Sequence, residues 1–191
     1  MFKSKYLITF ILLSVTIVNC NILQPKHKKE ADVLMPLAIG NSWTYSDNNI
    51  GTYTITIVDK KSINGKDYYL AVDDAYQDTT LLKNESNGLS FVDKYDDNYY
   101  EYVFLRYPFD KTLNYSQTND LGGSVSYNAY KEKVDVPAGT FDCFIYEYKS
   151  DEYKLPNGGY ESVSGNLAFA PGVGIVGDSD GNSKLISYDL K

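Results

Sequence analysis

Apolar and polar residues alternate in short runs from Trp43 to the end of the chain, and turn sequences separate the runs. The clearest run, residues 52–58, has its tyrosine and isoleucines on one face and its threonines on the other. A period of two predicts a β-strand, and the following Asn64-Gly65 predicts a tight hairpin turn. No segment after residue 35 has the 3.6-residue period of a capped helix, so an all-β domain is predicted. Further strands are expected at 67–72, 79–83, 89–93, 98–107, 124–136, 141–148, 166–170, 175–177 and 184–190.

The predicted strand 98–107 is apolar on both faces. Tyr100, Tyr102 and Phe104 share one face, and Val103 and Leu105 lie on the other. A strand that is covered on both faces is typical of a sheet that wraps around a core or lines a cavity. We therefore expect a single curved, mainly antiparallel sheet, a half-barrel or open barrel of about eight to eleven strands with little helix. Tyr100, Tyr102 and Phe104 are predicted on its concave side, as candidate ligand contacts.

The first twenty residues have the layout of a bacterial lipoprotein signal. Lys3 and Lys5 precede an uncharged run over residues 6–18, which leads into Asn19-Cys20. About a dozen apolar residues are too few for a membrane-spanning helix, which needs roughly 20, but they fit a secretory signal. The end of the run resembles the lipobox of bacterial lipoproteins, in which the cysteine receives a diacylglycerol and the signal is cut before it. We expect a signal peptide over residues 1–19 and lipid on Cys20; an ordinary signal peptide with an incidental cysteine is the alternative.

The remaining chain divides into a tether and a domain. Residues 20–35 show no structural period and are interpreted as the lipidated Cys20 and a flexible tether, and residues 36–191 as the β domain. Removing residues 1–19 leaves 172 residues, enough for one domain with a sizeable core. The net charge is −7 for the full chain and −9 without those residues, which disfavours nucleic acid as a partner. By the sorting rule of some diderm bacteria, Asn21 after the cysteine favours the outer membrane.

Three motifs combine proline, glycine and aromatic or branched residues. They read Pro36-Leu-Ala-Ile-Gly-Asn-Ser-Trp-Thr-Tyr45, Val136-Pro-Ala-Gly-Thr-Phe-Asp-Cys-Phe144 and Ala170-Pro-Gly-Val-Gly-Ile-Val176. In order and spacing they resemble the motifs of a family of bacterial lipoproteins that lack assigned activities. The resemblance spans most of the mature chain. It implies a curved antiparallel sheet related to the half-barrel of lipoprotein-carrier proteins.

The motif residues also predict local structure directly. Trp43 follows turn chemistry at Gly40-Asn41 and is expected to close one end of the core. Pro137 fixes φ and Gly139 permits a positive φ, which predicts a tight corner. The glycines of 171–174 precede a predicted strand, whereas a phosphate-binding glycine loop precedes a helix. A phosphate site is therefore rejected.

Residues for catalysis are scarce. His27 is the only histidine of the chain and lies in the predicted tether, so a Ser–His or Cys–His pair or a histidine-bearing zinc site within the domain is excluded. Cys143 lies among aromatic residues of a predicted strand and is interpreted as a buried, inert thiol; with Cys20 lipidated, no intramolecular disulfide can form. Carboxylate pairs at strand ends and turns leave a hydrolase open: Asp73, Asp74, Asp78, Asp93, Asp96 and Asp97.

Residues 178–189 partly match a calcium-binding loop, with aspartate or asparagine at its first, third and fifth positions. Ser183 replaces the glycine of the sixth position, and Asp189 replaces the bidentate glutamate of the twelfth. Strand patterns flank the segment, where such a loop has helices. We interpret it as a solvated hairpin turn, and we expect no metal and no cofactor.

Together these features predict a lipid-anchored protein of the cell envelope whose β domain binds or scaffolds a partner without catalysis. The partner is the membrane through the lipid, together with a protein or a hydrophobic ligand that the sequence does not identify. The first alternative is a carrier that holds an apolar ligand inside the curved sheet. The second is a hydrolase that uses paired carboxylates. A large apolar cavity favours the carrier, and a filled core favours the binding or scaffolding protein.

Overall fold

The computed structural model describes residues 32–95, 98–155, 158–178 and 181–191, and within these ranges the regular structure is entirely β. The predicted signal peptide and Cys20 lie outside them. Fourteen strands follow one another along the chain. They are β1 (Ser42–Asp47), β2 (Gly51–Ile63), β3 (Lys66–Asp73), β4 (Thr79–Glu85), β5 (Gly88–Tyr95), β6 (Asn98–Arg106), β7 (Leu113–Thr118), β8 (Ser124–Val136), β9 (Gly139–Ser150), β10 (Tyr153–Lys154), β11 (Tyr160–Glu161), β12 (Ser164–Ala170), β13 (Gly174–Asp178) and β14 (Ser183–Asp189).

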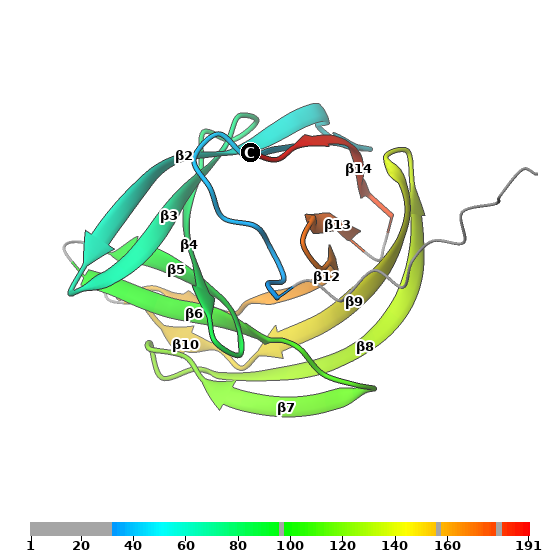
Figure 1. Ribbon diagram of the computed structural model, residues 1–191. Helices are drawn as coiled ribbons and strands as arrows, with labels where there is room; N and C mark the ends of the chain where they lie inside the picture. The colour runs from blue at the N-terminus through cyan, green and yellow to red at the C-terminus, as the bar shows by residue number, and fades with distance from the viewer. Residues whose placement is uncertain (1–31, 96–97, 156–157, 179–180) are drawn as a thin grey trace, which may run out of the picture.

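Twelve strands form one antiparallel sheet in the order β6-β5-β4-β3-β2-β1-β14-β13-β12-β9-β8-β7, and β10 and β11 pair separately. The sheet curls into a ring that brings its two edges, β6 and β7, close together (Figure 1). The prediction of a single curved antiparallel sheet in an all-β domain is confirmed. The strand number slightly exceeds the expected eight to eleven, because the short strands β1 and β7 were not predicted as separate elements.

Side-chain hydrogen bonds bridge the two edges of the sheet, together with one backbone bond from the Asp120 N–H, just after β7, to the Glu101 carbonyl of β6 over 3.0 Å. On β6, the Phe104 N–H donates to the Tyr127 hydroxyl over 3.2 Å, and the Tyr115 hydroxyl donates to the Phe104 carbonyl over 3.1 Å. The Tyr146 hydroxyl donates to the carbonyl of Arg106 over 2.7 Å. The backbone groups that an edge strand leaves unpaired are thus satisfied by tyrosines of β7, β8 and β9. We call this contact between β6 and β7–β9 the seam.

Aromatic side chains fill the inside of the ring. Phe144 meets Phe109 edge to face with ring centroids 4.7 Å apart, and Tyr146 meets Phe169 in the same way at 6.0 Å. Trp43 is completely buried, which confirms its predicted place in the core. Its indole N–H donates to the Val173 carbonyl over 2.6 Å. A filled interior explains why strands of the ring are apolar on their concave side.

The segment before β1 also belongs to the core. Leu34 and Met35 are each 1% exposed, and they lie where the chain crosses the inside of the ring (Figure 1). The Gly172 N–H donates to the Val33 carbonyl over 3.0 Å, and Asn84 Nδ2 donates to the Met35 carbonyl over 3.0 Å. The side chains of Leu34 and Met35 thus belong to the core, and Val33 contacts it through its carbonyl, although the sequence pattern predicted a β domain that begins at residue 36.

A β-bulge in β6 changes the expected faces of this strand. The register with β5 shifts between Phe91 and Val92, so Tyr102 has no direct partner. Tyr102 packs against the core beside Phe91, with ring centroids 6.4 Å apart. Phe104, in contrast, lies on the outer face, where its ring occupies the space beside Gly88. Strict alternation from Tyr100 to Phe104 was therefore wrong, because a bulge reverses the side-chain direction beyond it.

The first motif ties the start of the domain to its end. Asn41 is 1% exposed, and its Nδ2 donates to the Pro36 carbonyl over 2.9 Å. Its Oδ1 accepts the N–H of Lys191 over 2.8 Å. The asparagine that turn chemistry predicted thus also joins the segment before β1 to the residue after β14, across the middle of the sheet order.

Candidate functional site

The cavity among the concave side chains is small. It has a volume of about 140 Å³ and combines an apolar floor with a polar rim. The lining residues are Met35, Ile55, Ala71, Asp73, Tyr76, Asp78, Thr80, Leu82, Phe91 and Ile175. An acyl-chain carrier was expected to have several hundred Å³ of continuous apolar space. Leu34, Met35 and the aromatic residues occupy that space instead.

Carboxylates gather at the rim of this cavity. Asp73 and Asp78 line it, and Asp93 is half-buried nearby on β5. Burial raises the pKa of Asp93 above its ordinary value, and the negative charges of Asp78 and Glu161 raise it further. Asp73 Oδ1 accepts the Ala75 N–H over 2.8 Å, and Asp78 Oδ1 accepts the Thr79 N–H over 2.8 Å. These bonds fix the local turns, and the described residues contain no group of three or more potential ligands that could hold a metal.

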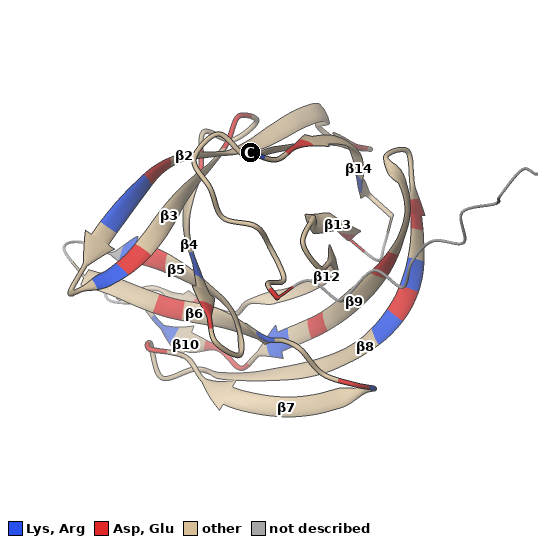
Figure 2. Cartoon of the chain, in the orientation of Figure 1, with Lys and Arg blue, Asp and Glu red and all other residues tan. Residues whose placement is uncertain are grey.

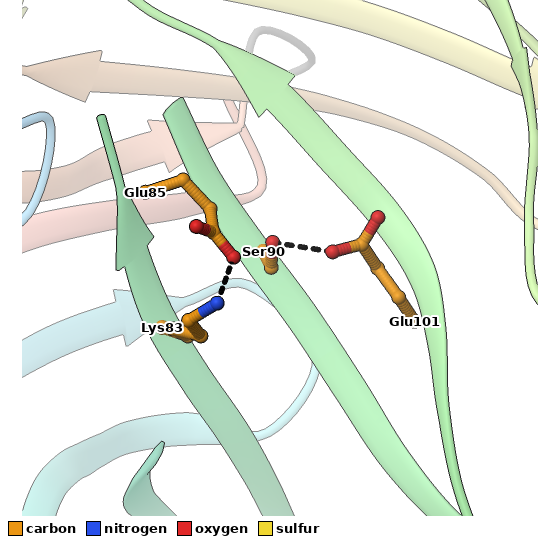
Figure 3. A network of polar contacts seen from close by, with 4 residues as sticks. All are labelled: Lys83, Glu85, Ser90 and Glu101. Carbon is orange, nitrogen blue, oxygen red and sulfur yellow. Dashed lines mark hydrogen bonds and ion pairs between the residues drawn. The ribbon is translucent and has the colours of Figure 1, made fainter. Parts of the chain in front are cut away.

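A second polar cluster lies on the outer face of β4, β5 and β6 (Figure 3). The Ser90 hydroxyl donates to Glu101 over 2.5 Å, and Lys83 forms an ion pair with Glu85. Burial raises the pKa of Glu101, which the bond from Ser90 partly offsets. Ser90 is 1% exposed, so a substrate cannot reach its hydroxyl. Ser90 and Glu101 therefore act as a cross-strand contact that holds the bulged strand in place.

A large polar depression lies on the outer face of the opposite half of the sheet, over β7, β8, β9 and β12. Its volume is about 870 Å³. Val125, Tyr127 and Ala129 of β8 point into the core, so the residues between them face outward into this depression. Eight lining residues face outward in this way; we call the surface they form the polar groove. They are Asn114, Ser116, Ser126, Asn128, Glu147, Lys149, Ser164 and Asn166.

Strand register arranges the polar groove in two rows that run across the sheet. One row follows the pairs Asn114–Asn128, Asn128–Glu147 and Glu147–Asn166. The other contains the three serines and Lys149, namely Ser116, Ser126, Lys149 and Ser164. With neighbouring strands about 4.8 Å apart, each row is about 14 Å long.

Glu147 is the centre of the first row. Its Oε2 accepts a hydrogen bond from Asn128 Nδ2 over 2.8 Å, and its Oε1 accepts one from the Tyr130 hydroxyl over 3.1 Å. The adjacent Asn166 has a buried Oδ1 that accepts no hydrogen bond from the residues described. A buried acceptor without a donor is costly, and an internal water can satisfy it.

Charge is sparse in this region. Figure 2 shows charged residues along β2, β3 and the part of the β8–β9 hairpin near its turn, whereas β7 has none. Within the polar groove only Glu147 and Lys149 are charged, so its formal charge is zero although the chain carries −7. The polar groove therefore suits a ligand that is polar and uncharged better than a polyanion or a polycation.

The structure separates the residues that the sequence proposed as ligand contacts. Tyr102 is part of the core, Phe104 is half-buried on the outer face, and Tyr100 is half-buried opposite Asp93. None of them lines the polar groove.

Cys143 is buried, and burial raises the pKa of its thiol to about 12, in agreement with an inert thiol.

The sequence contained a signal for the polar groove. Four strands each carry two polar residues separated by one: Asn114 and Ser116, Ser126 and Asn128, Glu147 and Lys149, and Ser164 and Asn166. Six of these eight residues are serine or asparagine, whereas strands prefer β-branched and aromatic residues. The repetition of the pattern in strands that pair with one another was the missed clue.

The hairpin prediction for 178–189 agrees with the described residues. Asp178 ends β13, and its carboxylate accepts the N–H groups of Asn182 and Ser183 over 2.8 and 3.1 Å. Strand β14 follows directly. Residues 179 and 180, which include the third position of the possible calcium loop, lie outside the described part of the chain. The prediction that no calcium binds remains to be tested.

Comparison with known proteins gives fold-level likeness only. No family model and no curated protein matches the chain. A candidate lipoprotein of Parabacteroides distasonis has a TM-score of 0.45 at 14% identity, over 84% of this chain and 100% of its own. A candidate exported protein of Bacteroides fragilis with a YmcC-like fold has a TM-score of 0.43 at 16% identity, again over 84% and 100%. With TM-scores below 0.5 and identities this low, neither structure assigns a function to the chain.

Among the described residues, no helix is long and apolar enough to cross a membrane.

Proposed function

We propose that this protein is an outer-membrane lipoprotein, held by lipid on Cys20, whose β domain binds a polar ligand without catalysing a reaction. The anchor rests on the basic start, the short apolar run and the cysteine at its end. Two cysteines occur in the chain, and Cys143 is buried in the domain. Only Cys20 is therefore placed for lipid attachment.

The polar groove carries the binding part of the proposal. It is the site where outward-facing side chains of four paired strands surround a depression of about 870 Å³. The interior cavity of about 140 Å³ is too small for an acyl chain, so the interior offers less support for the carrier alternative. Among the described carboxylates, those at the rim bond to turn amides and Glu101 bonds to a buried serine, which supports a structural role.

The anchor is tested by metabolic labelling with a fatty-acid analogue in a diderm host. The wild-type protein is expected to take up the label and to fractionate with the outer membrane. Cys20→Ala should lose both, because the thioether forms on that sulfur. Cys143→Ala is the matched control and should keep both. Label on the Cys20→Ala protein would contradict the anchor, and sedimentation with the inner membrane would contradict the location.

A further inference from the structure

We infer that the ligand of the polar groove is an uncharged glycan segment, with Glu147 as its central hydrogen-bond acceptor. This inference rests on the proposed binding function and names the class of ligand. It follows from three properties of the polar groove: the hydrogen-bonding capacity of its side chains, its zero formal charge, and the saturated backbone of its strands.

The side chains match hydroxyl groups. Serine hydroxyls and asparagine carboxamides each offer both donors and acceptors, as sugar hydroxyls do. Six of the eight outward-facing residues of the polar groove are serines or asparagines with an uncharged donor. The other two are Lys149, a charged donor, and Glu147, an acceptor. No outward-facing side chain in the polar groove is apolar, so it offers no pocket for the side chains of a protein partner.

The backbone argues against an extended peptide as the ligand. Peptides that bind to sheets add a strand to a free edge, where unpaired N–H and C=O groups are available. Strands β8 and β9 are paired on both sides, and β7 is the only strand of the polar groove that lies at an edge of the sheet. The Tyr115 side chain of β7 bonds to Phe104 across the seam, so β6 covers this edge. Recognition in the polar groove therefore depends on side chains alone.

Glu147 marks the centre of the site. A carboxylate has room for about four hydrogen bonds, and two on Glu147 come from Asn128 and Tyr130. These two bonds fix the rotamer and leave capacity for ligand hydroxyls. Asn166 pairs with Glu147 across the strands, but its Oδ1 is buried. Glu147 is therefore the acceptor that ligand hydroxyls can reach at this point.

The test is a calorimetric titration of the purified protein with soluble neutral oligosaccharides. The probes are malto-, cello-, xylo-, manno- and chito-oligosaccharides long enough to span the row of about 14 Å. We expect at least one probe to bind. Glu147→Gln and Asn114→Ala should each weaken that binding at least about tenfold, equivalent to about 1.4 kcal/mol. Ser116→Tyr should abolish it, because a tyrosine fills the groove and is well tolerated in a strand.

Asp142→Asn is the matched control for Glu147→Gln. Asp142 lies on the same strand but on its opposite face, and its side chain is 84% exposed in an ion pair outside the polar groove. This variant should bind as the wild type does. Circular dichroism checks that every variant is folded, and Asn114, exposed on an edge strand, is the variant least able to disturb the fold.

The outcomes separate this inference from the proposed function. Binding of heparin or of an extended peptide at the polar groove, with no neutral saccharide bound, overturns the glycan inference but supports a binding domain. Saccharide binding that survives Glu147→Gln, Asn114→Ala and Ser116→Tyr also overturns it, because the site then lies elsewhere. If none of the saccharides, heparin and peptides binds, both the inference and the binding function are wrong.

Discussion

Replacement of Trp43 tests the arrangement of the core most directly. Its side chain is completely buried, and its Nε1–H donates to the Val173 carbonyl over 2.6 Å. The indole lies so close to Gly174 that a Cβ there would be 3.0 Å from Nε1. Gly174 also has a positive φ of 114°, so no other residue fits easily beside the ring. Trp43 therefore joins β1 to the glycine-containing turn before β13.

The expected cost of Trp43→Ala has two parts. Removal of a buried tryptophan costs about 3–5 kcal/mol for lost transfer free energy and the cavity left behind. The orphaned Val173 carbonyl adds about 1–3 kcal/mol. Since domains of this kind have a total free energy of unfolding of about 5–15 kcal/mol, the variant loses a large part of its stability. Trp43→Phe keeps most of the ring and loses the donor, so its cost should be about 1–3 kcal/mol.

Urea denaturation followed by far-ultraviolet circular dichroism measures both costs, because this signal does not depend on the mutated residue. Tyr76→Ala is the control: its side chain is 67% exposed, so the change should stay within about 0.5 kcal/mol. The single tryptophan also predicts blue-shifted fluorescence in the folded wild type. A loss below about 1 kcal/mol for Trp43→Ala, or emission like that of free tryptophan in water, would refute the reasoning.

Three further predictions concern the rim, the seam and the hairpin. Because the pKa of Asp93 is raised in the fold, the native state binds more protons than the unfolded state just above the ordinary aspartate pKa of about 3.9, and stability falls as pH rises through the raised value. Asp93→Asn should therefore raise the urea midpoint at neutral pH but not at a pH below about 3.9; an equal change at both would contradict the raised pKa. Tyr127→Phe leaves the Phe104 N–H without its acceptor, so it should lower stability by about 1–3 kcal/mol and speed hydrogen exchange at Phe104, whereas the exposed Tyr160→Phe should do neither. Unchanged exchange at Phe104 in the Tyr127→Phe variant would show that the seam does not depend on this hydroxyl. Millimolar calcium should leave the melting temperature nearly unchanged, because the Asp178 carboxylate already bonds to two turn amides. An essential site would add about 2.7 kcal/mol at a hundredfold excess over Kd, and a shift of that size would overturn the hairpin interpretation.

The seam explains why the strand pattern could predict curvature but not closure. Alternation along the predicted strand 124–136 shows which residues face inward, including Tyr127. It does not show that the Tyr127 hydroxyl meets the edge of β6, because that contact depends on how far the whole sheet curls. Burial raises the pKa of Tyr115 to about 12, which keeps its hydroxyl protonated and able to donate to Phe104. A property of the complete ring thus determines the bonding of single side chains.

The bulge in β6 had a similar effect on the candidate ligand contacts. A period of two placed Tyr102 and Phe104 on one face, which is correct for an unbroken strand. The extra residue in β6 puts Tyr102 against the core and Phe104 on the outer face. A bulge depends on the pairing with the neighbouring strand, so the sequence of β6 alone does not reveal it.

By itself, the sequence determined the all-β class, most strands, the hairpin turns and the burial of Trp43. These features are local, since they follow from side-chain periodicity and from the backbone preferences of glycine and proline. The tertiary structure decided which strands are neighbours, and therefore which side chains share a site. The polar groove exists because β9 pairs with β8 on one side and with β12 on the other, which places Glu147 between Asn128 and Asn166. Residues this far apart in the chain become neighbours only through strand register, which the packing of the whole core determines.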